Sequence, residues 1–100
     1  MKRLLLGSGG LRSEERRNTW RAALDTFLGD VEEIVFVPYA LADYDDYVEK
    51  LTKIAFAGKR TLRGIHTFAD PIAAVENAQA ISIGGGNTFR LLKGLQDNNL

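Results

Sequence analysis

The sequence predicts an α/β fold: a three-layer sandwich in which helices cover both faces of a parallel sheet. Short continuous apolar runs, typical of strands buried on both faces, alternate with segments whose apolar residues recur at helical spacing. Glycine or proline stands where these apolar runs end, as expected where a strand turns toward the next helix. Strands separated by helices run parallel, so the pattern reads βαβαβαβα.

The first strand–helix unit opens the chain. Arg3–Leu6 is the first predicted strand, and the glycine-rich turn Gly7–Gly10 ends it. Ser13 is placed to cap the next helix, and two glutamates follow in its first turn, where negative charge is favoured. Apolar residues recur at helical spacing from Trp20 to Leu28, which predicts a helix packed on the sheet.

The second unit repeats this organisation. Ile34–Val37 is a buried strand that stops at Pro38, because a residue without an N–H is tolerated at a strand end. Asp43 is placed to cap a second helix with one apolar face, and Gly58 closes that helix.

The last two units contain a weak strand and a short helix. Thr61–His66, interrupted by a glycine and two basic residues, is expected at the sheet edge. Asp70 is an N-cap followed by proline at the first helical position, which predicts a helix over Ile72–Ala78. That helix leads into the strand Ala80–Ile83 and then into a final helix that begins at Asn87.

With strands numbered in chain order, we expect the spatial order 3-2-1-4, the first half of a doubly wound sheet. The turns Gly7–Gly10 and Gly84–Asn87 then face each other at the switch point, where ligands bind in such sheets. Residues 1–100 form a single unit without an internal boundary. The apolar fourth strand would be left as a bare sheet edge, so we expect a longer domain that is incomplete here on its C-terminal side.

Composition excludes several classes of protein. Thirteen basic and thirteen acidic residues balance, so no nucleic acid or anionic membrane is expected as a partner. There is no cysteine, which excludes disulfides and thiolate chemistry and suits a cytoplasmic protein. No apolar run approaches the roughly 18 residues of a membrane span.

The segment Gly84–Asn87 carries the clearest functional signal. Three consecutive glycines stabilise neither a strand nor a helix, so they serve positive φ angles or a close approach of the main chain. A strand–turn–helix junction of this kind leaves N–H groups at the positive end of a helix dipole, where they bind or stabilise a negative oxygen. The alternative is a tight connection with nothing bound.

Other chemistry is scarce, and no cofactor or metal is expected. His66 is the only histidine, and we expect it to be structural. The acidic residues from Asp43 to Glu49 have the spacing of a solvated helix face instead of a cation loop. Arg12 replaces the third glycine of a dinucleotide fingerprint, and the fourth-strand glycines lack the Gly-Lys-Ser/Thr ending of a P-loop.

Two runs, Gly64–Ala78 and Ile81–Lys93, resemble the peptidase E family of bacterial serine dipeptidases, which cleave after an N-terminal aspartate. The likeness extends to Val35–Ala40 and to Asp46-Tyr47, and it covers essentially the whole chain. The opening turn departs from it, since Gly9-Gly10 stands where an Asn-Ser-Thr-like segment is expected.

The resemblance implies hydrolysis of small aspartyl peptides through an acyl-enzyme. It places the nucleophilic serine on a Gly-Trp-Ser-Ala-Gly elbow one strand beyond the last helix, and its partners later still, so this chain alone should be inactive. It also implies that Gly86 and Asn87 form the oxyanion hole through main-chain N–H groups. The alternatives are a non-catalytic α/β module that binds a small ligand or anion and, third, a nucleotide-binding oxidoreductase domain.

Overall fold

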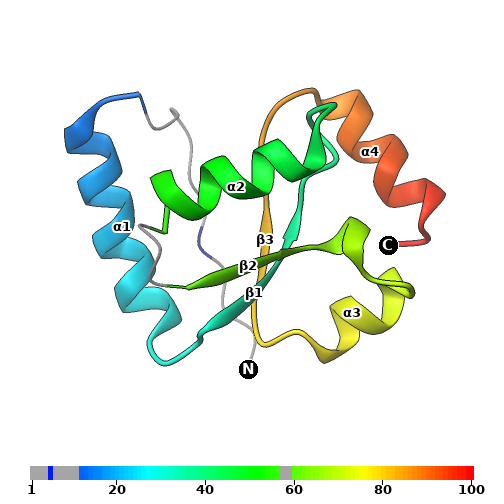
Figure 1. Ribbon diagram of the computed structural model, residues 1–100, viewed down its shortest axis with the longest axis horizontal. Helices are drawn as coiled ribbons and strands as arrows, with labels where there is room; N and C mark the ends of the chain where they lie inside the picture. Colours follow the sequence, from blue (N-terminus) through cyan, green and yellow to red (C-terminus); the bar gives the residue numbers. More distant parts are fainter. Residues whose placement is uncertain (1–4, 6–11, 57–59) are drawn as a thin grey trace.

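The fold alternates strands and helices as the sequence predicts, and the α/β class with a parallel sheet is confirmed (Figure 1). The computed structural model describes residues 5, 12–56 and 60–100. Within these residues the strands are β1 (Glu33–Val37), β2 (Thr61–Gly64) and β3 (Ile81–Ile83). The helices are α1 (Glu14–Leu28), α2 (Tyr44–Ile54), α3 (Pro71–Asn77) and α4 (Thr88–Asp97), with a 3₁₀ turn η1 (Ile65–Thr67).

Each helix begins at the cap that the sequence predicts. The Ser13 hydroxyl accepts a hydrogen bond from the Arg16 N–H at 3.1 Å. Carboxylate or amide oxygens do the same at the other three helices, where the caps are Asp43, Asp70 and Asn87. These side chains satisfy N–H groups that have no partner within the helix, so local sequence alone fixes where each helix starts.

The ends of two elements differ from expectation. The predicted strand Thr61–His66 stops at Gly64, because the Thr67 hydroxyl donates to the Gly64 carbonyl oxygen at 2.7 Å and η1 turns the chain there. The second helix ends at Ile54, and Gly58, expected to close it, lies outside the described residues. β2 has a single neighbour among the described strands, in agreement with its expected place at an edge.

β1 is the central strand of the sheet. It pairs in parallel with β2, where Ile34 lies beside Leu62, and with β3, where Val35 lies beside Ile81. The order of the described strands is therefore β2-β1-β3.

This order corrects the expected arrangement 3-2-1-4. That arrangement placed a strand at Arg3–Leu6 between the strands now seen as β1 and β3, which instead bond to each other directly. A strand has two edges, and both edges of β1 are occupied by β2 and β3. Apart from Leu5, which packs against the core, the predicted first strand and the turn Gly7–Gly10 lie outside the described residues, as does the cleft expected between that turn and Gly84–Asn87.

Helices cover the two faces of the sheet in pairs. On one face, α1 and α2 pack over a core centred on Ile34 and Phe36. On the other face, α3 and α4 pack over Val35 and Val37. Alternate residues of β1 thus enter opposite cores, as the pleat of a strand buried on both faces requires.

An apolar surface remains uncovered beside β3. Ile81 and Ile83 are 45% and 58% exposed, and on α4 Phe89 is 86% exposed and Leu92 52%. Among the described residues β3 pairs on one side only. None of the helices in the described part of the chain combines the length and apolar character needed to cross a membrane.

Candidate active-site turn

The turn Gly84–Asn87 joins β3 to α4 and is bonded to the segment that follows β1. The Gly84 N–H donates to the Val37 carbonyl oxygen at 3.1 Å, and the Asn87 N–H donates to the Ala40 carbonyl oxygen at 3.0 Å. The turn therefore sits at the carboxyl end of two neighbouring parallel strands. This is the edge of a parallel sheet where ligands bind.

Gly84 and Gly86 are glycines for different reasons. A Cβ at Gly84 would lie 2.5 Å from the Tyr47 hydroxyl oxygen and 2.6 Å from the Phe36 ring, so only glycine fits beneath the turn. Gly86 has φ of 144°, a conformation that side chains disfavour, and a Cβ there would meet Ala40 and Leu41 at 2.9–3.1 Å. The expectation that these glycines serve positive φ or close approach is confirmed at both positions.

Asn87 anchors the end of the turn. Its side-chain oxygen accepts hydrogen bonds from the Phe89 and Arg90 N–H groups at 3.0 and 3.1 Å, which confirms the predicted cap of α4. The Asn87 N–H donates to the Ala40 carbonyl oxygen, so the main-chain donor expected from Asn87 already has an acceptor within the chain. By contrast, no described residue accepts a hydrogen bond from the N–H of Gly85 or Gly86.

Tyr47 supports the turn from α2. Its hydroxyl donates to the Gly85 carbonyl oxygen at 2.8 Å, and its ring meets Phe36 edge-on with centroids 5.0 Å apart. Burial raises the pKa of the Tyr47 phenol above its ordinary value of 10, so the hydroxyl keeps its proton at neutral pH. The sequence offered no local signal for this contact, which joins residues 38 positions apart.

His66 forms a second polar contact near the carboxyl end of the sheet. Its Nε2 lies 2.7 Å from Oδ1 of Asp45, and because a carboxylate only accepts, Nε2 carries the proton. Its Nδ1 is buried and has no hydrogen-bond partner among the described residues. The ring packs edge-on against Tyr44, and a Cβ at Gly64 would collide with it.

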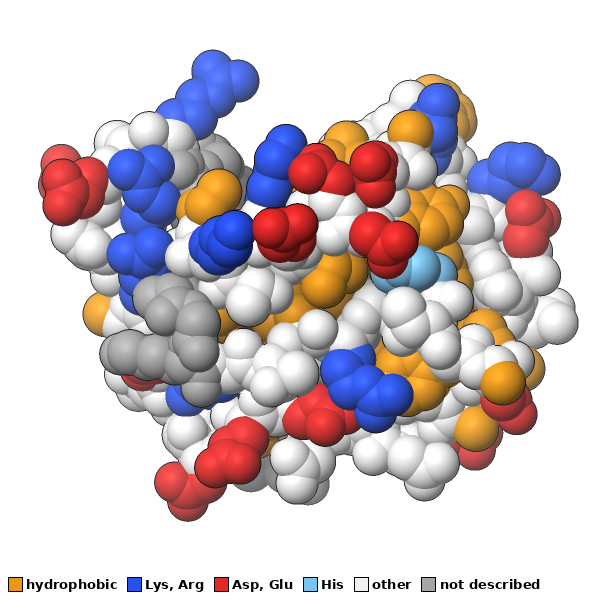
Figure 2. Space-filling view, in the orientation of Figure 1, with side chains coloured by type: hydrophobic (Ala, Val, Ile, Leu, Met, Phe, Trp, Pro, Cys, Tyr) orange, Lys and Arg blue, Asp and Glu red, His pale blue; other side chains and the backbone are white. Residues whose placement is uncertain are grey.

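Sequence spacing did not connect Asp45 with His66, although the topology could have done so. A helix between two parallel strands runs antiparallel to them, so the start of α2 meets the end of β2. The histidine lies next to an acidic side chain on the surface in Figure 2, where basic and acidic groups are interspersed.

The acidic residues at the start of α2 have separate structural roles. Asp43 caps the helix, Asp46 pairs with Lys50 at 2.9 Å, and Glu49 pairs with Lys53 at 3.1 Å. Among the described residues, no cluster of three acidic or histidine side chains could hold a metal ion.

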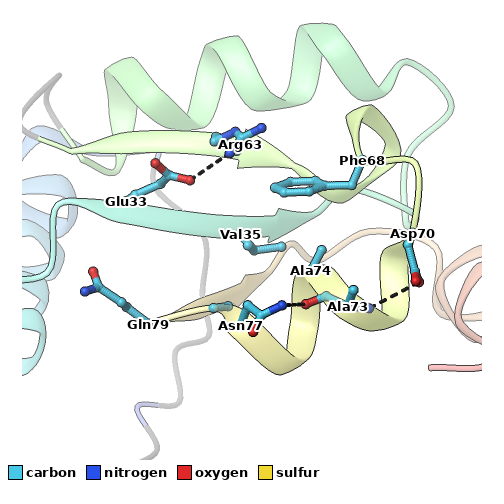
Figure 3. A pocket seen from close by; sticks show the side chains of 10 residues that line it. Glu33, Val35, Arg63, Phe68, Asp70, Ala73, Ala74, Asn77 and Gln79 are labelled. Atoms are coloured by element: carbon cyan, nitrogen blue, oxygen red, sulfur yellow. Dashed lines mark hydrogen bonds and ion pairs between the residues drawn. The ribbon is translucent and has the colours of Figure 1, made fainter.

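A groove of about 640 Å³ lies between α3 and the β1–β2 part of the sheet (Figure 3). Several of its polar side chains already have partners: Arg63 pairs with Glu33 at 3.1 Å and stacks 4.4 Å from the Phe68 ring centroid. Asp70 caps α3, and the Asn77 amide donates to the Ala73 carbonyl oxygen. None of the lining residues belongs to the Gly84–Asn87 turn, so the groove is a separate surface feature.

Comparisons with known proteins show the family of this chain. The sequence profile described as peptidase family S51 matches residues 3–100, so the chain belongs to that family. It is 38% identical over 103 residues to a protein named peptidase E from Streptomyces coelicolor, covering 100% of this chain and 41% of that protein. Proteins of the same name from Shigella flexneri serotype 5b and Escherichia coli O6:K15:H31 are 43% and 41% identical over 68 residues.

The matched region is one part of these relatives. The 68-residue matches cover 66% of this chain and 30% of each relative, and the Streptomyces match covers less than half of that protein. Because the Streptomyces match spans all of this chain, these 100 residues can replace the matched segment of the Streptomyces protein. The resulting hybrid protein is called the chimera.

We expect the change His66→Gln to leave turnover of the chimera within a few-fold of its unmodified value. The ring of His66 contacts Asp45, Tyr44 and Gly64, all of which are structural partners. Removal of a triad member costs roughly 10⁴ or more in kcat, which separates the two roles clearly. The measurement is kcat together with thermal unfolding, and a loss near 10⁴ in a folded variant would make His66 the base.

Proposed function

We propose that this chain supplies the oxyanion-stabilising part of a serine dipeptidase active site, acting on dipeptides with an N-terminal aspartate. Membership of peptidase family S51 and the likeness to proteins named peptidase E support a peptidase. The observation that carries the site assignment is the Gly86 N–H. It lies in a glycine turn with positive φ at Gly86, ahead of α4, and has no acceptor among the described residues.

The chemistry needs such a donor. When a serine hydroxyl attacks the peptide carbonyl, the carbonyl carbon becomes tetrahedral and its oxygen becomes negative. A base removes the hydroxyl proton and returns it to the leaving amine as the peptide C–N bond breaks, and water then hydrolyses the acyl-enzyme. Fixed N–H groups aimed at the oxyanion lower the barrier because they need no reorganisation during the reaction.

Gly86 and Asn87 have different roles in stabilising the oxyanion. Gly86 provides the N–H, and the start of α4 adds the positive end of a helix dipole. Asn87 caps α4 and, through its N–H on Ala40, ties the turn to the segment after β1. Its contribution is therefore to hold the oxyanion donor in place.

The nucleophile and its base are expected from the rest of the enzyme. The open edge of β3 is the place for one further parallel strand, and the exposed side chains Ile81, Ile83, Phe89 and Leu92 would then be covered. A strand on that edge ends beside the Gly84–Asn87 turn. A serine on an elbow at that strand end would face the proposed oxyanion donor.

The test is hydrolysis of aspartyl-leucine and of leucyl-leucine by the chimera and by the 100-residue chain. We expect the chimera to cleave the aspartyl dipeptide selectively and the chain alone to cleave neither. Equal cleavage of both dipeptides would refute the aspartate preference. Cleavage by the purified 100-residue chain would refute the expectation that the nucleophile and its base come from the rest of the enzyme. A folded chimera without any dipeptidase activity would favour a non-catalytic ligand-binding module.

A further inference from the structure

We infer that Tyr47 is the positioning residue of the turn: its hydroxyl fixes the Gly85–Gly86 peptide plane and so aims the Gly86 N–H. The catalytic consequence rests on the proposed function, whereas the structural part does not. The inference begins from the 2.8 Å hydrogen bond between the Tyr47 hydroxyl and the Gly85 carbonyl oxygen. That oxygen and the Gly86 N–H belong to the same peptide unit.

A trans peptide is planar, and its C=O and N–H point in opposite directions. All peptide bonds among the described residues are trans. When Tyr47 holds the Gly85 oxygen toward α2, the Gly86 N–H must therefore point away from α2. One contact on the carbonyl side thus sets the direction of the donor on the other side.

The peptide needs such a restraint because glycine stands on both sides of it. Glycine populates positive and negative φ with similar ease, so a Gly–Gly peptide can rotate at low cost unless a contact holds it. Beside it, Gly84 and Asn87 are each fixed by a main-chain hydrogen bond, but no main-chain bond among the described residues holds Gly85 or Gly86. Tyr47 supplies the missing restraint.

Tyr47 can act in this way because its own ring is held. Phe36, which is fully buried, meets the Tyr47 ring edge-on. The Tyr47 ring also packs closely against Gly84, where a Cβ would collide with it. The hydroxyl is thus delivered from a packed side chain on a regular helix. A donor on such a rigid support fixes geometry more closely than one on a mobile side chain.

The test compares Tyr47→Phe with Tyr44→Phe in the 100-residue chain by NMR. Both variants lose one hydroxyl from α2, but the Tyr44 hydroxyl has no hydrogen-bond partner among the described residues. We expect the Gly86 N–H order parameter to be about 0.85 in the wild type and in Tyr44→Phe, and to fall below about 0.6 in Tyr47→Phe. The Gly85 carbonyl ¹³C resonance should shift in Tyr47→Phe alone.

An unchanged Gly86 order parameter and Gly85 resonance in a folded Tyr47→Phe variant would overturn the inference. The wild-type chain gives a second test of the inference without any variant. An order parameter below about 0.6 for the Gly86 N–H in this chain would show that the turn is not held. That measurement remains decisive if Tyr47→Phe does not fold.

Kinetics in the chimera separate this inference from the proposed function. We expect Tyr47→Phe to lower kcat by about tenfold, the effect of one hydrogen bond of ordinary net strength, with KM little changed. If the NMR result holds while kcat is unaffected, Tyr47 positions the turn but the turn is not an oxyanion hole. If the NMR result fails, the positioning role fails whatever the kinetics show.

Discussion

Gly86→Val should lower kcat of the chimera by roughly 10²–10³, the cost of losing one oxyanion donor. Valine at this position meets two obstacles. Gly86 has φ of 144°, and a Cβ would approach the Ala40 carbonyl oxygen to 3.0 Å and the Leu41 side chain to 2.9 Å. The turn must therefore shift, and the N–H that it presents moves with it.

Gly29→Val is the matched control. Gly29 also has positive φ, at 55°, so the substitution introduces backbone strain of a similar kind. It follows the last residue of α1, before β1 begins, at the end of the sheet opposite the turn. We expect this variant to lose stability and to keep its kcat. Full turnover in a folded Gly86→Val chimera would contradict the assignment, because it would show that the glycines only make a tight connection between β3 and α4.

Phe36→Ala should destabilise the 100-residue chain by about 3–5 kcal/mol, the usual cost of removing a buried aromatic ring. Phe36 is 0% exposed in the centre of β1 and contacts both Tyr47 and the position of Gly84. Small domains have only about 5–15 kcal/mol in total, so most of the stability would be lost. Urea unfolding at 25 °C measures the change.

The control for Phe36→Ala is Phe89→Ala, which removes the same ring from a side chain that is 86% exposed. An exposed substitution of this kind usually changes stability by less than about 0.5 kcal/mol. A loss below about 1 kcal/mol for Phe36→Ala would mean that β1 is not the centre of the core.

The sequence predicted the local features of this fold well. A helix cap depends on a side chain and on N–H groups two or three residues away, so Ser13, Asp43, Asp70 and Asn87 could each be found in a short window. Strand order depends on which edges meet in space, and no short window contains that information. The direct pairing of β1 with β3 was therefore missed.

The same distinction between local and long-range contacts applies to the candidate site. The turn and its cap were predictable, because three glycines followed by asparagine have few other uses. The support from Tyr47, the acceptor for the Asn87 N–H and the partner of His66 all come from distant parts of the chain. The Ala40 contact occupies the Asn87 N–H, so of the predicted pair Gly86 and Asn87 only Gly86 is kept as the proposed donor.

The most direct measurement follows the Gly86 amide while an oxyanion is present. A chimera labelled with ¹⁵N-glycine would be titrated with a boronic acid analogue of aspartate, which forms a tetrahedral anionic adduct with a serine nucleophile. The ¹¹B resonance reports formation of the adduct. We predict that the Gly86 amide proton then moves downfield, because its N–H donates to the anionic oxygen. An unchanged Gly86 resonance in the presence of the complete adduct would contradict the assignment.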